Sequence, residues 1–140
     1  MPEPRHERGL LDTSVVIDLD RIQRGQLPGE LAISAVTLAE LAAGPHATDD
    51  VDERARRQDR LQRVEATFDP LPFDAAAARA FGRIYSLVAA SGRKARGRRA
   101  MDLLIAATAL GAGLPLYTRN PADVEHLAEL LEVEAIELPD

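Results

Sequence analysis

The stretch RRAMDLLIAATALGAGLPLYTRN, residues 98–120, contains the longest uncharged run of the chain. Its apolar residues predict a deeply buried helix from about 100 to 112, and residues 114–117 then predict a strand. The uncharged run, 103–118, has 16 residues, fewer than the roughly 20 that a membrane-spanning helix requires. A buried helix followed at once by a strand is typical of an α/β domain.

The rest of the chain alternates the same two kinds of segment. Further strands are expected at 9–11, 31–33 and 133–138, and helices from Ser14 to near Gly25, at 35–43, 49–66 and 75–90, and again from Asn120-Pro121. Strands that alternate with helices predict a parallel sheet with helices on both sides. With 140 residues, we expect a single domain over 1–140, with 1–8 as a flexible N-terminal extension.

Composition restricts the chemistry. Hydrophobic residues make up 46% of the chain and charged residues 29%, which indicates a folded protein. The N-terminal sequence lacks the apolar segment of a signal peptide, so we expect a soluble, cytoplasmic protein. Because there is no cysteine, thiolate metal sites and cysteine nucleophiles are excluded. The three histidines have neither HxH nor HExxH spacing, so a metal site would use oxygen ligands.

Four acids stand at the edges of the predicted strands and helices: Asp12, Glu40, Asp102 and Asp123. In parallel α/β folds, ligands bind beyond the carboxyl ends of the strands, where Asp12 and Thr118 each end a strand. Carboxylates that lie close together repel one another unless a cation compensates them. We therefore predict that these acids hold Mg²⁺ or Mn²⁺, which prefer oxygen ligands and retain waters, one of which could attack a phosphodiester.

Each acid also has a purely structural interpretation. Asp12 could cap a helix, and Glu40 could be a partly exposed helix residue. Asp102 could pair with Arg98 one helical turn earlier, and Asp123 could be a first-turn acid favoured by the helix dipole.

Three polar residues near the acids could orient carboxylates or contact substrate: Ser14, Thr118 and Asn120. Ser14 belongs to the sequence Asp12-Thr13-Ser14, in which both hydroxyls could hold the first carboxylate. The alternatives are helix capping for Ser14 and Asn120 and strand-end packing for Thr118. Ser34 and Asp74 are placed to cap the helices that follow them.

Charge is unevenly distributed around a net value of −6. From 75 to 101 there are seven basic residues and no acid, whereas the chain after Arg119 has acids but no Lys or Arg. An acidic protein repels nucleic acid at long range, so an RNA contact would need a local basic patch. The candidates form a basic tract of five residues: Arg93, Lys94, Arg96, Arg98 and Arg99. The alternative for this tract is a solvated loop.

Four motifs together resemble the PIN-domain family, and specifically its VapC-like toxins of toxin–antitoxin pairs. The motifs are LLDTSVVID (10–18), SAVTLAELAAG (34–44), RRAMDLLIAATALGAGLPLYTRNPADVEHL (98–127) and EAIELP (134–139). Each motif alone is weak, but their order and separation are specific, and they span nearly the whole chain.

The resemblance implies a three-layer α/β/α fold with a mainly parallel sheet, and Mg²⁺-dependent endoribonuclease activity. The family's acids fall on Asp12, Glu40, Asp102 and Asp123, and the polar positions of its T-x-N-x-x-D element fall on Thr118 and Asn120. Some members carry an acid at the position of Asn120. The resemblance also implies a small cognate antitoxin whose extended tail covers the site, and a homodimer or a toxin–antitoxin hetero-oligomer.

Two other functions are compatible with the residues alone. A Mg²⁺-dependent phosphatase or phospho-acceptor domain would use Asp12 as a nucleophile, but Thr13-Ser14 does not continue a DxDxT motif and the only lysine, Lys94, lies in the basic tract. A non-catalytic binding module on the same scaffold would have lost its metal chemistry, although all four acids are present.

Overall fold

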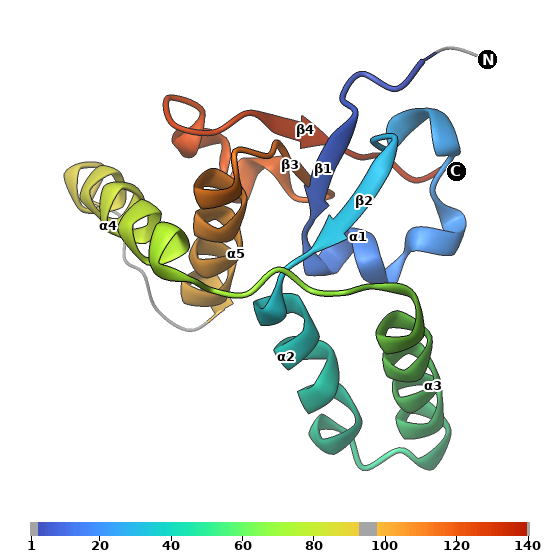
Figure 1. Ribbon diagram of the computed structural model, residues 1–140. Coiled ribbons are helices and arrows are strands. Elements are labelled where there is room, and N and C mark those ends of the chain that lie inside the picture. Colours follow the sequence, from blue (N-terminus) through green and yellow to red (C-terminus); the bar gives the residue numbers. More distant parts are fainter. Residues whose placement is uncertain (1–2, 93–97, 140) are drawn as a thin grey trace.

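The computed structural model describes residues 3–92 and 98–139. Four parallel strands form one sheet in the order β2-β1-β3-β4 (Figure 1). The strands are β1 (Arg8–Leu11), β2 (Glu30–Ile33), β3 (Leu116–Thr118) and β4 (Val133–Ala135). The predicted parallel sheet is confirmed, although β4 is shorter than expected.

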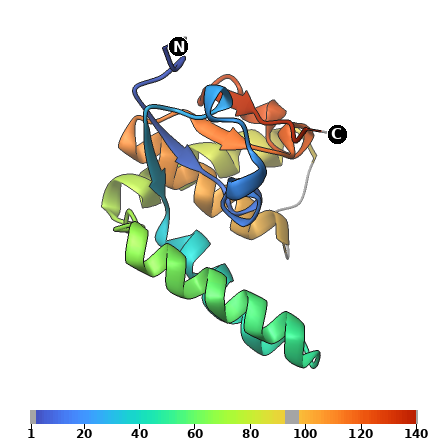
Figure 2. The same cartoon turned by 90° about the vertical axis from the view of Figure 1, so that its right-hand side faces the viewer.

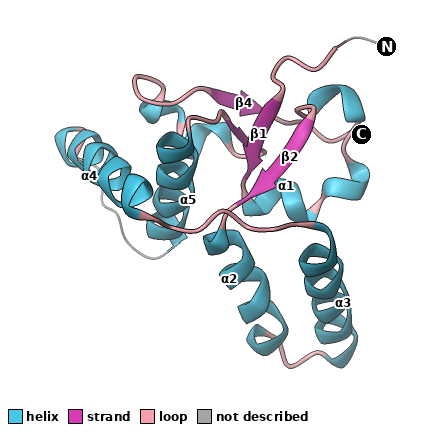
Figure 3. Cartoon of the chain, viewed as in Figure 1, coloured by secondary structure: helices cyan, strands magenta, loops and turns pink. Residues whose placement is uncertain are grey.

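The described residues form five α-helices (Figure 3). They are α1 (Thr13–Ile17), α2 (Ala35–Ala43), α3 (Val51–Thr67), α4 (Ala75–Ala90) and α5 (Arg98–Ala112). Helices α4 and α5 cover one side of the sheet and α1 lies on the other, while α2 and α3 extend past the carboxyl ends of the strands (Figures 1 and 2). This is the expected three-layer α/β/α arrangement. No helix among the described residues is long and apolar enough to cross a membrane.

Alternating side chains of the central strands build two separate cores. Leu10 and Leu116 pack in the cluster that contains α4 and α5, and each is at most 1% exposed. Leu11 and Tyr117, the next residues along each strand, pack in the other cluster with Val15 of α1. Because successive strand residues point to opposite faces, two apolar residues in each strand are enough to join both helical layers to the sheet.

Two glycines permit close approach between elements. A Cβ added to Gly9 of β1 would lie 2.7 Å from Cδ1 of Tyr117. A Cβ added to Gly111 of α5 would lie 2.8 Å from the backbone nitrogen of Ala77 in α4. The absence of a side chain at these positions lets the Tyr117 ring lie against β1 and lets α4 and α5 pack closely.

Two predicted helix caps are confirmed. The hydroxyl of Ser34 accepts a hydrogen bond from the backbone N–H of Thr37 at 3.0 Å, and the carboxylate of Asp74 accepts one from Ala77 at 2.9 Å. Both capping residues have extended backbone and directly precede the first helical residue. Capping by a local side chain is specified within four residues, which is why sequence alone located these helix starts.

The first helix differs from its prediction. It begins at Thr13 and is capped by Asp12, whose Oδ1 accepts from the backbone N–H of Val15 at 3.2 Å, so the predicted Ser14 cap is wrong. Asp12 caps as well as serine does and stands directly at the end of β1, so the helix starts earlier. After α1 the chain continues in two 3-10 turns, Leu19–Arg21 and Arg24–Gln26, in place of the predicted longer helix.

The segment after β3 also departs from the prediction of a helix opening at Asn120-Pro121. It forms 3-10 turns at Pro121–Asp123 and Glu125–Leu127. Between them, Val124 has φ −130° and ψ 1°, which lies outside the α-helical region and interrupts the helix. Asp123 therefore ends a short turn and is not a first-turn residue of an α-helix.

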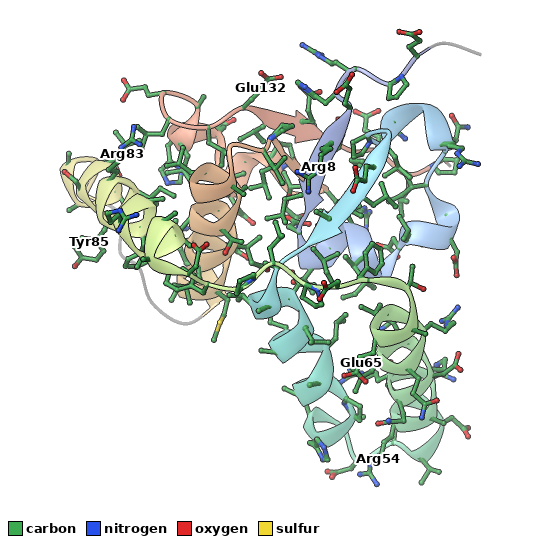
Figure 4. All side chains as sticks on the ribbon, viewed as in Figure 1. Arg8, Arg54, Glu65, Arg83, Tyr85 and Glu132 are labelled. Atoms are coloured by element: carbon green, nitrogen blue, oxygen red, sulfur yellow. The ribbon has the colours of Figure 1, made fainter. Side chains whose placement is uncertain are left out.

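Part of the stretch expected as an N-terminal extension contacts the amino-terminal end of the sheet. His6 Nε2 lies 2.5 Å from Oε2 of Glu132 and 3.4 Å from Oε1 of Glu134, and Arg5 Nε lies 3.5 Å from the same Glu134 oxygen. Figure 4 labels Glu132 at this edge of the molecule. These contacts join the residues that precede β1 to the start of β4.

Tyr117 is buried close to these charges, and the His6 ring meets it edge to face at a centroid separation of 6.2 Å. Burial and the negative charges of Glu134 and Glu132 raise the pKa of Tyr117 to about 12. The phenol therefore stays neutral at physiological pH.

Candidate metal centre

One cavity of about 220 Å³ lies at the carboxyl-terminal end of the sheet, and we call it the acid pocket. Its lining is Asp12, Thr13, Ser14, Glu40, Asp102, Leu116, Thr118, Asn120, Asp123 and Val124. The four acids and three polar residues singled out by the sequence all belong to this lining. They come from the ends of β1 and β3, from α2 and α5, and from the turn after β3, so the parallel topology brings distant segments together.

Asp12 stands where β1 passes into α1. Its Oδ1 accepts a 2.5 Å hydrogen bond from the Ser14 hydroxyl in addition to the capping bond from Val15. Burial raises the pKa of the Asp12 carboxyl above its ordinary value of 3.8, while hydrogen bonds from the Ser14 and Thr118 hydroxyls act in the opposite direction. Because Asp12 is harder to ionise than a carboxyl in water, a cation bound next to it would stabilise its ionised form.

Ser14 links Asp12 to the segment that follows β3. While its hydroxyl donates to Asp12, its oxygen accepts from the backbone N–H of Arg119 at 3.2 Å. The Arg119 guanidinium forms an ion pair with Asp18, the residue that ends α1. Because the backbone and the side chain of Arg119 both bind the α1 segment, the position of Asp12 is fixed relative to β3.

Glu40 reaches the acid pocket from the middle of α2. Its Oε1 accepts a 2.6 Å hydrogen bond from the hydroxyl of Thr13. No described residue donates to its other oxygen, Oε2, which is therefore available to a ligand. The sequence predicted that the hydroxyls of Thr13 and Ser14 could both bind Asp12. In the structure Ser14 donates to Asp12, whereas Thr13 donates to Glu40.

The other two acids enter from the opposite part of the chain. Asp102 is partly buried on the first half of α5, and Asp123 is exposed at the end of its 3-10 turn. The backbone N–H of Asn120 donates to the Thr118 hydroxyl at 3.0 Å, which fixes the turn that carries Asp123. The side chain of Asn120 makes no capping bond, so helix capping does not explain this residue.

Most of the basic tract lies outside the described residues. Arg93, Lys94 and Arg96 lie outside the described residues, and α5 begins at Arg98. Arg99 is partly buried in the first turn of that helix. The contact between this tract and RNA stays a prediction.

The donor set of the acid pocket fits a hard divalent cation. Among the side chains that the structure describes, all ligand candidates in the lining are oxygens, and none of the lining residues is Lys, Arg or His. Within the described residues, the group of three acidic or histidine side chains whose ligand atoms lie within 4.8 Å of one another is His6, Glu132 and Glu134, not the four acids of the pocket. Mg²⁺ commonly binds through one or two carboxylates and several waters, so the wider spacing in the pocket is compatible with it.

Of the two threonines that organise the site, sequence reasoning assigned Thr13 to the wrong acid and did not single out Thr37. Thr13 binds Glu40, and Thr37 lies 3.0 Å from Thr13 through their hydroxyl oxygens. Thr37 precedes Glu40 by three residues, a spacing that places both side chains on the same face of a helix. That spacing was a readable signal, but only the packing of α1 on α2 identifies Thr13 as the residue between them.

Comparisons with known proteins agree with this geometry. The sequence profile of the PIN domain matches residues 9–130. Ribonuclease VapC5 of Mycobacterium tuberculosis is 39% identical over 115 residues, which cover 80% of this chain and 82% of that protein.

Solved structures extend the likeness to three dimensions. A chain in the crystal structure of VapBC-5, a toxin–antitoxin system of M. tuberculosis, matches with a TM-score of 0.79 and 39% identity, covering 94% of this chain and 99% of that one. VapBC2 from Rickettsia felis, bound to a DNA fragment of its promoter, matches with a TM-score of 0.73, covering 93% and 99% of the two chains. At 20% identity, this second match shows the fold alone.

Proposed function

Since this chain belongs to the PIN-domain family, we propose that it is a Mg²⁺-dependent endoribonuclease acting as the toxin of a toxin–antitoxin pair. The observation that carries the proposal is the acid pocket, which gathers Asp12, Glu40, Asp102 and Asp123 at the carboxyl-terminal end of the sheet. The similarity to Ribonuclease VapC5 supports RNA as the substrate.

The carboxylates would hold Mg²⁺, with Mn²⁺ as a possible substitute. When bound, the ion would lower the pKa of a coordinated water and stabilise negative charge at the leaving oxygen. Asp12 and Glu40 would serve as its principal protein ligands, because each already has one oxygen fixed by a hydroxyl. Asp102 and Asp123 would complete the set from the other side of the pocket.

The reaction that suits this pocket is hydrolysis of a phosphodiester. The oxygen of a water attacks phosphorus, a carboxylate of the pocket accepts the proton, and the bond from phosphorus to the 3′-oxygen breaks. The Ser14 and Thr13 hydroxyls keep their carboxylates oriented during this transfer. Basic residues 93–99 would contact RNA phosphates, which contributes affinity without reading sequence.

A cognate antitoxin is the partner that the similarity to VapBC-5 supports. A groove between α1, α2 and α3 adjoins the acid pocket and shares Thr13 and Glu40 with it. Ile17 of α1, which is 42% exposed, and Arg60 of α3 line both this groove and the next hollow along α3. An extended antitoxin tail lying in this groove would reach the acids and block RNA.

The nuclease proposal is tested by RNA cleavage with purified protein in Mg²⁺, in Mn²⁺ and in EDTA. We expect cleavage in either ion, none in EDTA, and none for Asp102→Ala. Asp59→Ala is the matched control, because Asp59 is an exposed acid on α3 that pairs with Arg63 outside the pocket. Cleavage by Asp102→Ala at the wild-type rate, or cleavage in EDTA, would contradict the proposal.

The partner proposal is tested by co-expression with the short open reading frame expected next to the gene. We expect a stable complex that does not cleave RNA, and weaker capture by Ile17→Glu, which keeps the nuclease itself active. Light scattering of the free chain and of the complex would establish whether homodimers or hetero-oligomers form. Failure to capture any antitoxin with the wild-type chain would contradict this part of the proposal.

A further inference from the structure

A continuous chain of hydroxyl groups leads from the protein interior to the acid pocket. The hydroxyl of Ser34 lies 3.4 Å from that of Thr37, and the Thr37 hydroxyl lies 3.0 Å from that of Thr13. Thr13 in turn donates to Glu40 at 2.6 Å. Ser34 and Thr37 are both fully buried, and neither belongs to the pocket lining.

The direction of these hydrogen bonds follows from counting protons. A hydroxyl has one proton to donate, and an ionised carboxylate can only accept. Thr13 donates its only hydroxyl proton to Glu40. In the hydrogen bond between the two threonines, Thr37 must therefore be the donor and Thr13 the acceptor. Because the Thr37 hydroxyl proton is already donated to Thr13, the Ser34 hydroxyl must donate to Thr37. The Ser34 oxygen in turn accepts a hydrogen bond from the backbone N–H of Thr37.

Every hydroxyl of the chain thus donates once and accepts once, and all three protons point toward one carboxylate. Hydrogen bonds arranged in this way polarise and strengthen one another in a buried environment. The chain also crosses between elements, since Ser34 and Thr37 belong to the start of α2 and Thr13 to the start of α1. It therefore ties the carboxylate to the junction of two helices.

We propose that Thr37, which does not line the pocket, positions the Glu40 carboxylate through the hydroxyl of Thr13. Its role in metal binding rests on the proposed function, whereas its action on the carboxylate does not. Thr37 is a positioning residue, because it touches neither the metal site nor a substrate. A purely structural role would require only that its volume be filled and its hydroxyl be hydrogen-bonded.

The first test measures Mn²⁺ binding by calorimetry. Thr37→Val keeps the shape and β-branching of the side chain but removes the hydroxyl, and we expect it to weaken Mn²⁺ binding by about 10-fold, as loss of an outer partner of a metal ligand does. Thr37→Ser restores a hydroxyl, so we expect nearly wild-type affinity. If Thr37→Val does not fold, Thr37→Ala is compared with Thr37→Ser in its place.

Thr108→Val is the matched control. Thr108 is also a buried helical threonine, but its hydroxyl donates to the carbonyl of Leu104 in its own helix at 2.9 Å. We expect this control to bind Mn²⁺ as the wild type does. Unchanged Mn²⁺ affinity in Thr37→Val, or equal weakening in Thr37→Val and Thr37→Ser, would overturn the proposal.

A second measurement separates this inference from the nuclease proposal. Urea unfolding in EDTA is compared for the wild type, Thr37→Val, Glu40→Ala and the double variant. If the hydroxyl chain acts on Glu40, the effect of the double variant on the unfolding equilibrium constant should differ by about twofold or more from the product of the two single-variant effects. If the two single-variant effects simply add, the inference is overturned even if the wild type cleaves RNA. If the effects do not add but the wild type binds no Mn²⁺, the inference stands and the nuclease proposal fails.

Discussion

The two ends of the sheet both gather acids, but they compensate them differently. At the amino-terminal end, Glu132 and Glu134 contact His6, and the Arg5 guanidinium, 3.5 Å from Glu134, offsets part of the charge of that acid. At the carboxyl-terminal end, the described residues that line the acid pocket include four acids and no basic side chain. Asp12 and Glu40 have neutral hydroxyls as their side-chain partners, so a cation from outside the protein would stabilise them.

The hydrogen bonds at the two ends support the same distinction. Asp12 and Glu40 accept bonds from the neutral hydroxyls of Ser14 and Thr13, which orient a carboxylate without removing its charge. Compact geometry alone does not identify the site, because the closest-spaced group of possible metal ligands among the described residues is at the amino-terminal end. What distinguishes the pocket is that, among the described residues, Asp12 and Glu40 have neutral hydroxyls and not cations as side-chain partners.

The largest expected effect is on RNA cleavage. Asp12→Ala and Glu40→Ala should each lower the cleavage rate by at least about 100-fold, because losing a metal ligand costs no less than losing the outer partner of one. Glu132→Ala at the other end should leave the rate unchanged. A single-turnover assay in Mg²⁺ would measure both rates. If Glu132→Ala lowered cleavage as much as Asp12→Ala, the functional difference between the two ends of the sheet would be contradicted.

At the amino-terminal end the large effect should be on stability. Gly9→Ala places a methyl group against the buried Tyr117 ring, so we expect the free energy of unfolding to fall by about 1–3 kcal/mol, the usual consequence of overpacking. Gly25→Ala is the control, because a Cβ there has no neighbour within 4 Å. Urea unfolding would measure the free energy of unfolding of both variants. Equal values for Gly9→Ala and Gly25→Ala would contradict the tight contact between Gly9 and the Tyr117 ring.

Asp12 should oppose folding at neutral pH in the absence of metal. Its pKa is raised by burial, so the folded protein binds this proton more tightly than the unfolded chain does, and ionisation destabilises the fold. The penalty is full above the folded-state pKa and disappears as pH falls below the unfolded value of 3.8. Asp12→Asn, which retains a capping oxygen, should therefore be more stable than the wild type at pH 7 in EDTA.

The control for this measurement is the same pair of proteins at lower pH. The stability advantage of Asp12→Asn should shrink as pH falls toward 3.8, and saturating Mg²⁺ at pH 7 should reduce it by stabilising the wild type. An advantage that grows on acidification would show that the charge of Asp12 is already compensated inside the protein.

The smallest effect should come from breaking an ion pair at the amino-terminal end. Glu134→Gln keeps the size of the side chain, and we expect a loss of at most about 1 kcal/mol in the free energy of unfolding, with cleavage unchanged. Thermal unfolding followed by an activity assay would check both. A loss of activity in a stable Glu134→Gln protein would place function at this end as well.

Much of the fold was readable from local patterns. The strands β1 and β2 and the caps Ser34 and Asp74 follow from apolar runs and capping residues that act within a few positions, and the alternation of strands with helices predicted that the strands are parallel. The prediction failed where several short-range rules compete, as at the start of α1 and after Asn120, where 3-10 turns replaced expected helix. Such turns depend on how the segment packs, not on its periodicity alone.

The candidate site divides in the same way. The sequence by itself determined which acids could meet, because a parallel sheet places the ends of its strands at one edge. Only the tertiary structure decided which hydroxyl serves which acid, assigning Thr13 to Glu40 and Ser14 to Asp12. It also decided which acids contact basic side chains, since His6 and Glu134 are 128 residues apart. Local propensities specify short-range structure, whereas charge compensation depends on strand order, which brings together residues that no sequence window contains.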